Sequence, residues 1–485
     1  MDSAIQGLKP EIVWKYFAEI AKIPRPSKHE EAMIRYVMDV AKQLGLPSKK
    51  DKSGNVVVKK PASPGRENVP MIALQGHLDM VTEKNKDKTH DFFKDPIELV
   101  RKGNVIMANG TTLGADNGIA VATNLAIMED RSLEHGPLEF LFTVDEETGL
   151  TGATNLDPNL LESKTMLNLD SEEEGALYVG CSGGRNTIGT WKVVAERIPK
   201  NHTPALLQVR GLRGGHSGLE IDKGRGNSLK IMNRILMEFD KMDVRIASME
   251  GGNKSNAIPR EAEAVVFIPS KKFAKAIEVV KNFETTIKAE IKTVDPDLEI
   301  SLTETKVKKT VKVFKKPLQQ KILQTISALP HGVTKMSADI PGLVETSTNV
   351  AVLETKKNAV VLTTSQRSSV ASEILEILQT HASIFVMGGA AFKHTDGYPG
   401  WKPNLDSPIL KTAVQTYKNL YGKEPAVKAI HAGLECGIIG EKYPGMDMLS
   451  FGPTLEGVHS PDEKIYIDTV DKFWNFLLAI LKNVN

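Results

Sequence analysis

Two histidines and three acids have the chemistry of a metal centre. They are His77, Asp116, Glu147, Asp170 and His459. Imidazole and carboxylate without thiolate suit zinc, manganese or cobalt, and the mixture argues against an all-oxygen calcium or magnesium site. Because this set is larger than a single catalytic zinc needs, it predicts two ions that share one bridging carboxylate.

A fourth acid, Glu146, is expected to act as a base. It stands between Asp145 and Glu147 in a run of three carboxylates that would repel one another without nearby positive charge. Water activated by metal needs a group that accepts its proton, so we expect Glu147 to bind metal and Glu146 to serve as general base. Asp79, two residues after His77, is placed to hold the other nitrogen of that imidazole.

Structural roles compete with these assignments. An acid that follows a strand often caps the next helix, and a histidine at a strand end can simply be a satisfied polar residue. The recurrence of "GHLD", "GADNG", "DEE" and "NLD" in one predicted domain favours a metallohydrolase instead.

The elements that must position these side chains follow an α/β pattern. Apolar runs that predict short strands are "GNVVVKK", "PMIALQGHLDMV", "LEFLFTVDEE" and "TMLNLDSEEEG". Helical spacing between them, as in "DNGIAVATNLAIMED", predicts a mixed sheet flanked by helices. Sites in such sheets collect at the carboxyl ends of strands, where the polar clusters stand.

A second domain is expected inside the first. From about Trp191 alternating strands and amphipathic helices predict an α+β texture, whose pattern recurs once without sequence identity. The α/β texture returns after "GYPGWKPNLDSP". We therefore predict one domain over 1–186 and 390–485, interrupted by a second domain over 187–389.

Composition excludes several classes. The 485 residues favour two domains, and a net charge of +2 without a basic tract predicts no nucleic-acid partner. The N-terminal sequence lacks a signal-peptide pattern, and no apolar run approaches the roughly 20 residues that span a bilayer. Two cysteines, Cys181 and Cys436, cannot form a disulfide framework, so we expect a cytoplasmic protein that does not bind membranes.

The chain resembles a known family. The motifs that carry the resemblance run in family order along nearly the whole chain: "GHLDMV", "LGADNGIA", "TVDEETG", "NLDSEEEG" and "GVHSPDE". They are similar to those of the M20 metallopeptidases. The length, the inserted domain and "HAGLECG" resemble the aminoacyl-histidine dipeptidase branch, also called Xaa-His dipeptidase, peptidase D or carnosinase-like.

This resemblance implies a ligand set for two zinc ions, with Mn²⁺ or Co²⁺ as possible substitutes. His77 and Asp170 would bind one ion, Glu147 and His459 the other, and Asp116 would bridge them. By motif, Glu146 matches the general base and Asp79 the acid that orients imidazole.

The resemblance also implies roles outside the metal ligands. Asp116 would be followed by a cis peptide to Asn117. The domain over 1–186 and 390–485 would be the catalytic dimetal peptidase domain, and the inserted domain over 187–389 would be a lid and dimerisation surface of a homodimer. His216 in "GLRGGHSG" would stabilise the oxyanion, commonly in the partner subunit's site, and Asn256 would lie near the substrate. Arg367 in "TSQRSS" would suit a bidentate clamp on a substrate carboxylate, although an exposed arginine at a strand end is the structural alternative.

The predicted function is metal-dependent hydrolysis of a small dipeptide, of the Xaa-His type, by water between two zinc ions. Four alternatives remain: an aminoacylase-like deacylase, a carboxypeptidase, a dimetal phosphoesterase, and a metal-stabilised binding protein without catalysis. Phosphate substrates usually require more basic or amide-rich loops, and a structural site needs no base like Glu146 beside its ligands.

Overall fold

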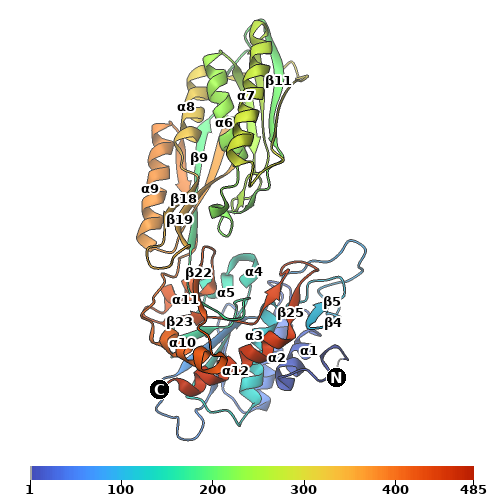
Figure 1. Cartoon of the computed structure of the whole chain (residues 1–485), viewed down its shortest axis with the longest axis vertical. Coiled ribbons are helices and arrows are strands. Elements are labelled where there is room, and N and C mark those ends of the chain that lie inside the picture. The colour runs from blue at the N-terminus through green and yellow to red at the C-terminus, as the bar shows by residue number, and fades with distance from the viewer. Residues whose placement is uncertain (1–2) are drawn as a thin grey trace. The chain divides into compact units, whose positions relative to one another are not determined.

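The computed structural model describes residues 3–485, which form two compact units. The first contains the described residues through Gly180 together with Pro403–Ala429 and Leu434–Asn485. The second contains Cys181–Lys402 and Ile430–Gly433. The second unit is therefore built from one long segment of the chain and one short loop, and the first unit from the rest (Figure 1).

The first unit is built on an eight-stranded mixed sheet. In spatial order its strands are β1 (Ser48–Lys50), β2 (Val56–Lys60), β6 (Leu138–Thr143), β3 (Ile72–His77), β7 (Thr165–Asn168), β23 (Asp447–Ser450), β8 (Ala176–Cys181) and β22 (Ala426–Ile430). The central strands β6, β3, β7 and β23 are parallel to their neighbours in this group. Every residue of β3 and β6 is buried, which explains why their sequences read as continuous apolar runs.

Helices flank this sheet, as the sequence predicts. They are α1 (Glu11–Ile20), α2 (Glu31–Gln43), α3 (Ala115–Glu129), α4 (Glu146–Gly149), α5 (Thr151–Thr154), α10 (Pro408–Tyr421), α11 (Glu435–Lys442) and α12 (Ile467–Asn483), with a 3₁₀ turn at Ser3–Ile5. Helix α3 is buried along almost its whole length, whereas α2 and α10 bury one apolar stripe. The predicted α/β class is confirmed.

A smaller antiparallel sheet in this unit escaped the sequence analysis. Its order is β24 (Leu455–Glu456), β25 (Lys464–Tyr466), β5 (Val105–Ala108) and β4 (Leu99–Lys102). Two of its strands are only two and three residues long, too short to give a clear alternating pattern. The pairing of β25 with β5 brings the segment that precedes α12 against the segment that precedes α3.

The second unit has a nine-stranded antiparallel sheet. Its strands are β16 (Glu299–Glu304), β11 (His202–Arg210), β15 (Ala262–Pro269), β13 (Arg245–Gly251), β19 (Val344–Thr355), β20 (Ala359–Ser368), β9 (Gly183–Lys192) and β21 (Ala391–His394), with β18 (Gly332–Met336) beside β19. Two short pairs are β10 (Ala195–Glu196) with β17 (Val313–Phe314) and β12 (Gly215–His216) with β14 (Ala257–Ile258). Single 3₁₀ turns lie at Ile221–Lys223 and Ser270–Lys272.

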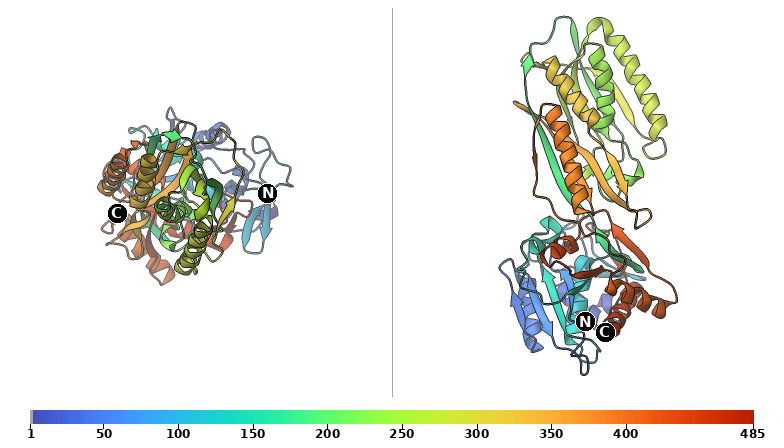
Figure 2. Two further views of the ribbon diagram at one scale, coloured as in Figure 1. Left: turned by 90° about the horizontal axis from the view of Figure 1, so that it is seen from above. Right: turned by 90° about the vertical axis from the view of Figure 1, so that its left-hand side faces the viewer.

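Four helices cover one face of this large sheet, as Figures 1 and 2 show. They are α6 (Ser228–Lys241), α7 (Phe273–Ile291), α8 (Lys316–Ala328) and α9 (Ala371–Met387). Their apolar sides join the sheet in one continuous core that includes Trp191, Phe239 and Phe385.

The recurring pattern seen in the sequence is a repeat of topology. One half runs β11-α6-β13-β15-α7-β16, and the other runs β9-α8-β19-β20-α9-β21, with the same strand order in each. The halves join where β13 meets β19 through Gly251 and Leu353. The first half lies between the first and second elements of the other, which is why only part of the repeat is contiguous in the sequence.

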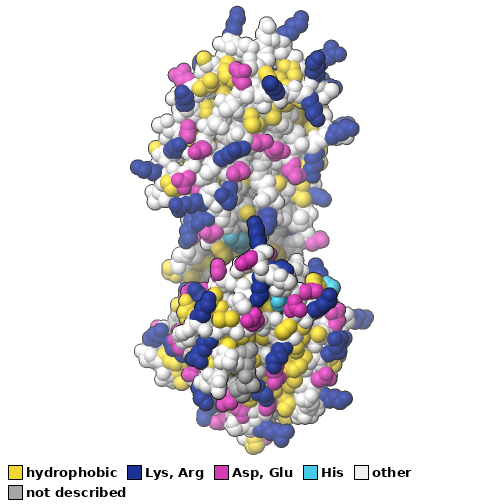
Figure 3. All heavy atoms as spheres, turned by 90° about the vertical axis from the view of Figure 1, so that its right-hand side faces the viewer, with side chains coloured by type: hydrophobic (Ala, Val, Ile, Leu, Met, Phe, Trp, Pro, Cys, Tyr) yellow, Lys and Arg dark blue, Asp and Glu magenta, His cyan; other side chains and the backbone are white. Residues whose placement is uncertain are grey.

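Surface charge is mixed. On the face shown in Figure 3, Lys and Arg side chains alternate with Asp and Glu. Within residues 3–485, every helix is too short or too polar to cross a lipid bilayer.

Candidate active site

Three neighbouring parallel strands deliver most of the predicted metal ligands. His77 ends β3, Glu147 follows β6 and Asp170 follows β7. Because β6, β3 and β7 are adjacent and parallel, the residues after them meet at one edge of the sheet. Asp116 lies at the start of α3, and its peptide bond to Asn117 is cis, as the resemblance implies.

All five side chains converge around Asp116. Its two carboxylate oxygens each lie 3.1 Å from a histidine Nε2, Oδ1 from His77 and Oδ2 from His459. His77 Nε2 is also 3.4 Å from Asp170 Oδ1, and His459 Nε2 is 3.0 Å from Glu147 Oε2. The contacts divide the five into two overlapping groups that share Asp116, the partition that the resemblance implies for two ions.

The donor set fits divalent cations. Glu147 Oε1 and Asp170 Oδ1 are buried and have no hydrogen-bond partner among the described residues. Hydrogen bonds to Asp116 and Glu147 raise the pKa of His459 to about 11. Burial opposes protonation of His77, yet Asp170 and Asp116 raise the pKa of that imidazole well above its usual range. Such an excess of negative charge is what bound metal would balance.

Asp79 connects the imidazole to the turn that carries the two glutamates. Its Oδ1 lies 3.3 Å from His77 Nδ1 and accepts the N–H of Glu146 at 3.0 Å. Its Oδ2 accepts the N–H of Glu147 at 3.1 Å and the hydroxyl of Ser27 at 2.7 Å. The single buried carboxylate therefore orients a candidate ligand and the candidate base together.

The three consecutive acids have three different surroundings. Asp145 is in the left-handed region, with φ of 50°, and its carboxylate accepts hydrogen bonds from Thr148 and Thr151, so it is a structural residue of the turn. Glu147 contacts His459, while Glu146 belongs to a possible ligand group with His77 and Glu147. Burial raises the pKa of Glu146 well above its usual range; the charge of His77 opposes this rise, whereas nearby carboxylates, Asp170 first, add to it. A carboxylate with a raised pKa is suited to general-base work.

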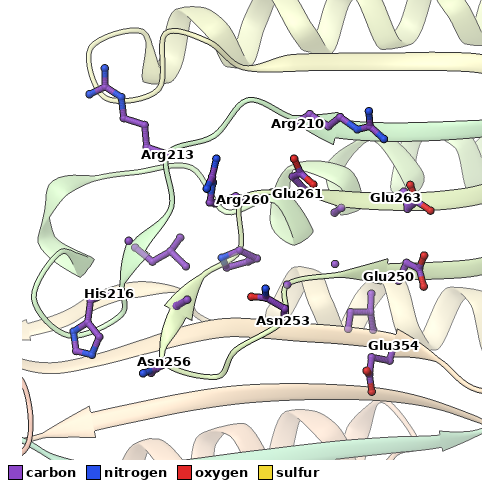
Figure 4. Close-up of a pocket in the computed structure, with 18 residues that line it drawn as sticks. Arg210, Arg213, His216, Glu250, Asn253, Asn256, Arg260, Glu261, Glu263 and Glu354 are labelled. Atoms are coloured by element: carbon purple, nitrogen blue, oxygen red, sulfur yellow. The ribbon is translucent and has the colours of Figure 1, made fainter. Parts of the chain in front are cut away.

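The second unit brings together three of the remaining predicted residues. His216 ends β12 and Asn256 directly precedes its partner β14, and Ser217 N–H donates to Asn256 O at 2.9 Å. Figure 4 shows both side chains at one end of an open cavity of about 800 Å³ that also has arginine and glutamate walls. Arg367 lies 3.5 Å from His216, measured from Nη2 to Nε2.

The local contacts define the state of His216. Its Nδ1 accepts the N–H groups of Gly218 at 3.3 Å and Leu219 at 3.1 Å, so Nε2 carries the hydrogen of the neutral ring. Burial, and then the charge of Arg367, lowers the pKa of His216 to about 4. Two donors, His216 Nε2 and the Arg367 guanidinium, therefore face each other, which is an arrangement suited to an anionic oxygen.

Arg367 is buried rather than exposed. Only 6% of it is accessible, and it donates from Nη1 to the Tyr398 hydroxyl at 2.8 Å. Its Nε has no partner among the described residues. The structural alternative of an exposed arginine at a strand end is wrong.

The motif "HAGLECG" contains two titratable residues, His431 and Glu435, to which the sequence assigns no role. They belong to different units. His431, in the second, lies 2.7 Å from the Ser347 hydroxyl. Glu435, in the first, is fully buried and accepts from Gln75 at 2.6 Å and Thr143 at 2.7 Å. Burial raises the pKa of Glu435 to about 7.

Several residues next to the predicted ones were not recognisable in the sequence or were overlooked there. Gln75 and Tyr398 carry no local signal, because each is recognisable only through a partner far away in the chain. Arg25 and Glu463 are also buried next to the ligand-bearing segments. Glu463 stands four residues after His459 in a motif already singled out, and an acid at that spacing was an available signal.

Comparison with known proteins supports one family. Residues 73–483 match the peptidase family M20/M25/M40. The chain is 39% identical over 483 residues to the cytosol non-specific dipeptidase of Escherichia coli (strain K12), covering 99% of both chains.

Solved structures agree. The aminoacylhistidine dipeptidase of Vibrio alginolyticus superposes with a TM-score of 0.93 and 41% identity, covering 100% of this chain and 98% of that one. A tripeptidase of Staphylococcus aureus shares the fold, with a TM-score of 0.57 and 17% identity over 98% of this chain and 99% of that one. With its ordered motifs, its convergent candidate ligands and these matches, the chain belongs to peptidase family M20/M25/M40.

Proposed function

We propose that this protein hydrolyses dipeptides with the help of two zinc ions, for which Mn²⁺ or Co²⁺ can substitute. The observation that carries the proposal is the convergence of His77, Glu147, Asp170 and His459 around Asp116, with Glu146 beside them. We assign His77 and Asp170 to one ion, Glu147 and His459 to the other, and Asp116 to both. Bound there, the ions would polarise the scissile carbonyl and acidify the attacking water.

Glu146 is the proposed general base. Asp79 holds the backbone N–H of Glu146, which keeps the carboxylate at the edge of the ligand cluster. The carboxylate accepts a proton from the attacking water and then donates that proton to the leaving amine.

The second unit is proposed to supply donors for the anionic oxygens of the substrate. Arg367, held by Tyr398, would bind the peptide carboxylate, and the neutral Nε2–H of His216 would stabilise the oxyanion. Asn256, at the same end of the cavity as His216, is the third proposed substrate contact.

The proposed substrate class is Xaa-His. The name of the Vibrio alginolyticus relative refers to aminoacylhistidine, whereas that of the Escherichia coli relative refers to non-specific dipeptidase activity. A broader dipeptidase is therefore the second candidate. Comparing an aminoacyl-histidine with the same dipeptide carrying alanine or leucine at its C-terminal position would distinguish the two.

The test is release of free histidine from an aminoacyl-histidine dipeptide before and after chelation, with zinc or manganese then added back. Release that stops with chelator and returns with metal supports the proposal. Hydrolysis of N-acetyl amino acids, longer peptides or phosphate esters in its place would indicate a deacylase, a carboxypeptidase or a phosphoesterase. Metal binding without turnover of any of these substrates would indicate a binding protein.

We further propose a homodimer in the cytoplasm. The name of the Escherichia coli relative includes the word cytosol, which supports the location. Light scattering on protein eluted from a size-exclusion column measures its mass in solution. A mass near 53.1 kDa, that of a single chain, would contradict the dimer.

A further inference from the structure

The carboxylate of Glu463 holds the turn that leads into Asp116. Its Oε2 accepts the N–H groups of Leu113 at 2.7 Å and Gly114 at 2.9 Å. Its Oε1 accepts those of Ala115 at 2.8 Å and Asp116 at 3.2 Å. Four consecutive N–H groups converge on one buried anion, because Gly114 adopts a left-handed conformation with φ of 69°.

Arg25 holds the same turn from its carbonyl side. Its Nη2 donates to Gly114 O, and its Nη1 donates to Leu78 O at 3.0 Å and Asp79 O at 2.7 Å. Arg25 is only 3% exposed. One buried cation therefore joins the turn before Asp116 to the segment that follows His77.

These contacts link the three segments that bear the central ligands. His459 and Glu463 lie on one loop, which leads directly into β25 and is anchored where β25 pairs with β5. Glu463 ties this loop to the turn before Asp116, and Arg25 ties that turn to His77. The position of the Asp116 carboxylate, 3.1 Å from both imidazoles, depends on where the turn is held.

We infer that Glu463 is a positioning residue for the metal centre, fixing the Asp116 carboxylate between His77 and His459, with Arg25 as the opposing anchor. This inference rests on the proposed metal centre. Glu463 itself uses both oxygens on backbone N–H groups, so its effect reaches the ions through Asp116. A residue that only stabilised the fold would change the unfolding free energy and leave the metal affinity of the folded protein unchanged.

The decisive variant is Glu463→Gln, which keeps the shape of the side chain and removes its charge and one acceptor oxygen. Metal-free protein is titrated with zinc in competition with a coloured chelator, and the gain in melting temperature on zinc addition is recorded. We expect zinc affinity to fall by about tenfold or more, as for other groups that orient ligands, and the zinc-dependent gain in melting temperature to shrink.

Glu456→Gln is the matched control. Glu456 is the last residue of β24, the strand that pairs with β25 just after Glu463. It is exposed and forms an ion pair with Lys464 at 2.9 Å. Its replacement should leave zinc affinity unchanged. Wild-type affinity in folded Glu463→Gln would overturn the inference. Failure of the wild-type protein to bind zinc would overturn the proposed metal centre instead.

Glu463→Asp decides the case if Glu463→Gln does not fold. It keeps the charge but is one methylene shorter, so it must either move the turn or lose N–H contacts. We expect folded protein with zinc affinity below that of the wild type. Unchanged affinity in this variant would show that the position of the turn does not control the ligand set.

Discussion

At the scale of single residues, the division of labour among three adjacent acids can be tested directly. Glu146→Gln removes the proposed proton acceptor, while the hydrogen bond from its backbone N–H to Asp79 remains. We expect zinc content near that of the wild type and a fall in kcat of about 10²–10⁴-fold, the usual contribution of general acid–base catalysis. Steady-state kinetics with elemental analysis of the same preparation measures both. Retention of most activity would assign the base elsewhere.

Tyr398→Phe tests the proposed carboxylate site. The change removes the hydrogen bond that Arg367 Nη1 donates to the hydroxyl and leaves the ring. Loss of one hydrogen bond, about 1 kcal/mol, should raise KM roughly fivefold with kcat nearly unchanged. A dipeptide amidated at its C-terminus lacks the carboxylate and serves as the control. An equal effect on both substrates would contradict a role at the carboxylate.

The residue-scale predictions also show what the sequence could reveal. His77, Glu147 and Asp170 were recognisable as candidate ligands because strands that are buried on both faces read as apolar runs, and these polar residues stand at or just after the strand ends. Arg25 and Glu435 were not, because each acts on partners distant in the chain through contacts that leave no periodic signal. Asp116 was recognisable by its motif, but the clamp on its backbone was not.

At the scale of elements, the turn between β6 and α5 is held by close packing. A Cβ on Gly152 would lie 2.2 Å from Val144 O and 2.7 Å from Asn55 Oδ1. Gly152→Ala should therefore lower the free energy of unfolding by about 1–3 kcal/mol, the usual cost of overpacking, and lower kcat by displacing Glu146. Urea unfolding and kinetics measure the two effects.

Gly149→Ala is the control, three residues earlier, at the end of α4. A Cβ there would meet only Thr151 Cγ2, at 3.3 Å. We expect a smaller loss of stability than for Gly152→Ala. Equal losses would show that the turn tolerates no side chain for a reason other than contact with Val144 and Asn55.

Element bounds were predictable to different degrees. The long amphipathic helices α6 and α7 have strong periodicity and were predicted. Strands β24 and β25 are too short to carry a pattern. The sequence did not show that β9 is the first strand of the second half of the repeat. Its neighbours in the sheet, β20 and β21, come much later in the chain.

At the scale of the whole molecule, buried neutral histidines predict sensitivity to acid. Burial lowers the pKa of His381 and of His431 to about 3, and their nitrogens contact Thr348, Thr364 and Ser347. The unfolded chain binds protons near pH 6.5, where the folded chain does not. Stability should therefore fall as pH drops from about 6.5 toward 3, by at most about 1.4 kcal/mol per pH unit for each group.

Urea unfolding at several pH values measures this slope. His381→Gln keeps a polar side chain among the threonines and removes one titrating group. The slope of the unfolding free energy against pH should therefore fall by the contribution of one proton, at most about 1.4 kcal/mol per pH unit. An unchanged slope would place the acid sensitivity in other groups.

The nested repeat in the nine-stranded sheet has a consequence for synthesis on the ribosome. Strand β9 emerges before the whole half that begins with β11, yet its partners β20 and β21 emerge after that half. The half from β11 to β16 is contiguous and can close first, whereas β9 has to wait. In the first unit, β7 can pair with β3, which precedes it, but the sheet between β7 and β8 is completed only when β23 has been made. His459 follows β23, so the last of the five proposed metal ligands leaves the ribosome only after that strand has been made.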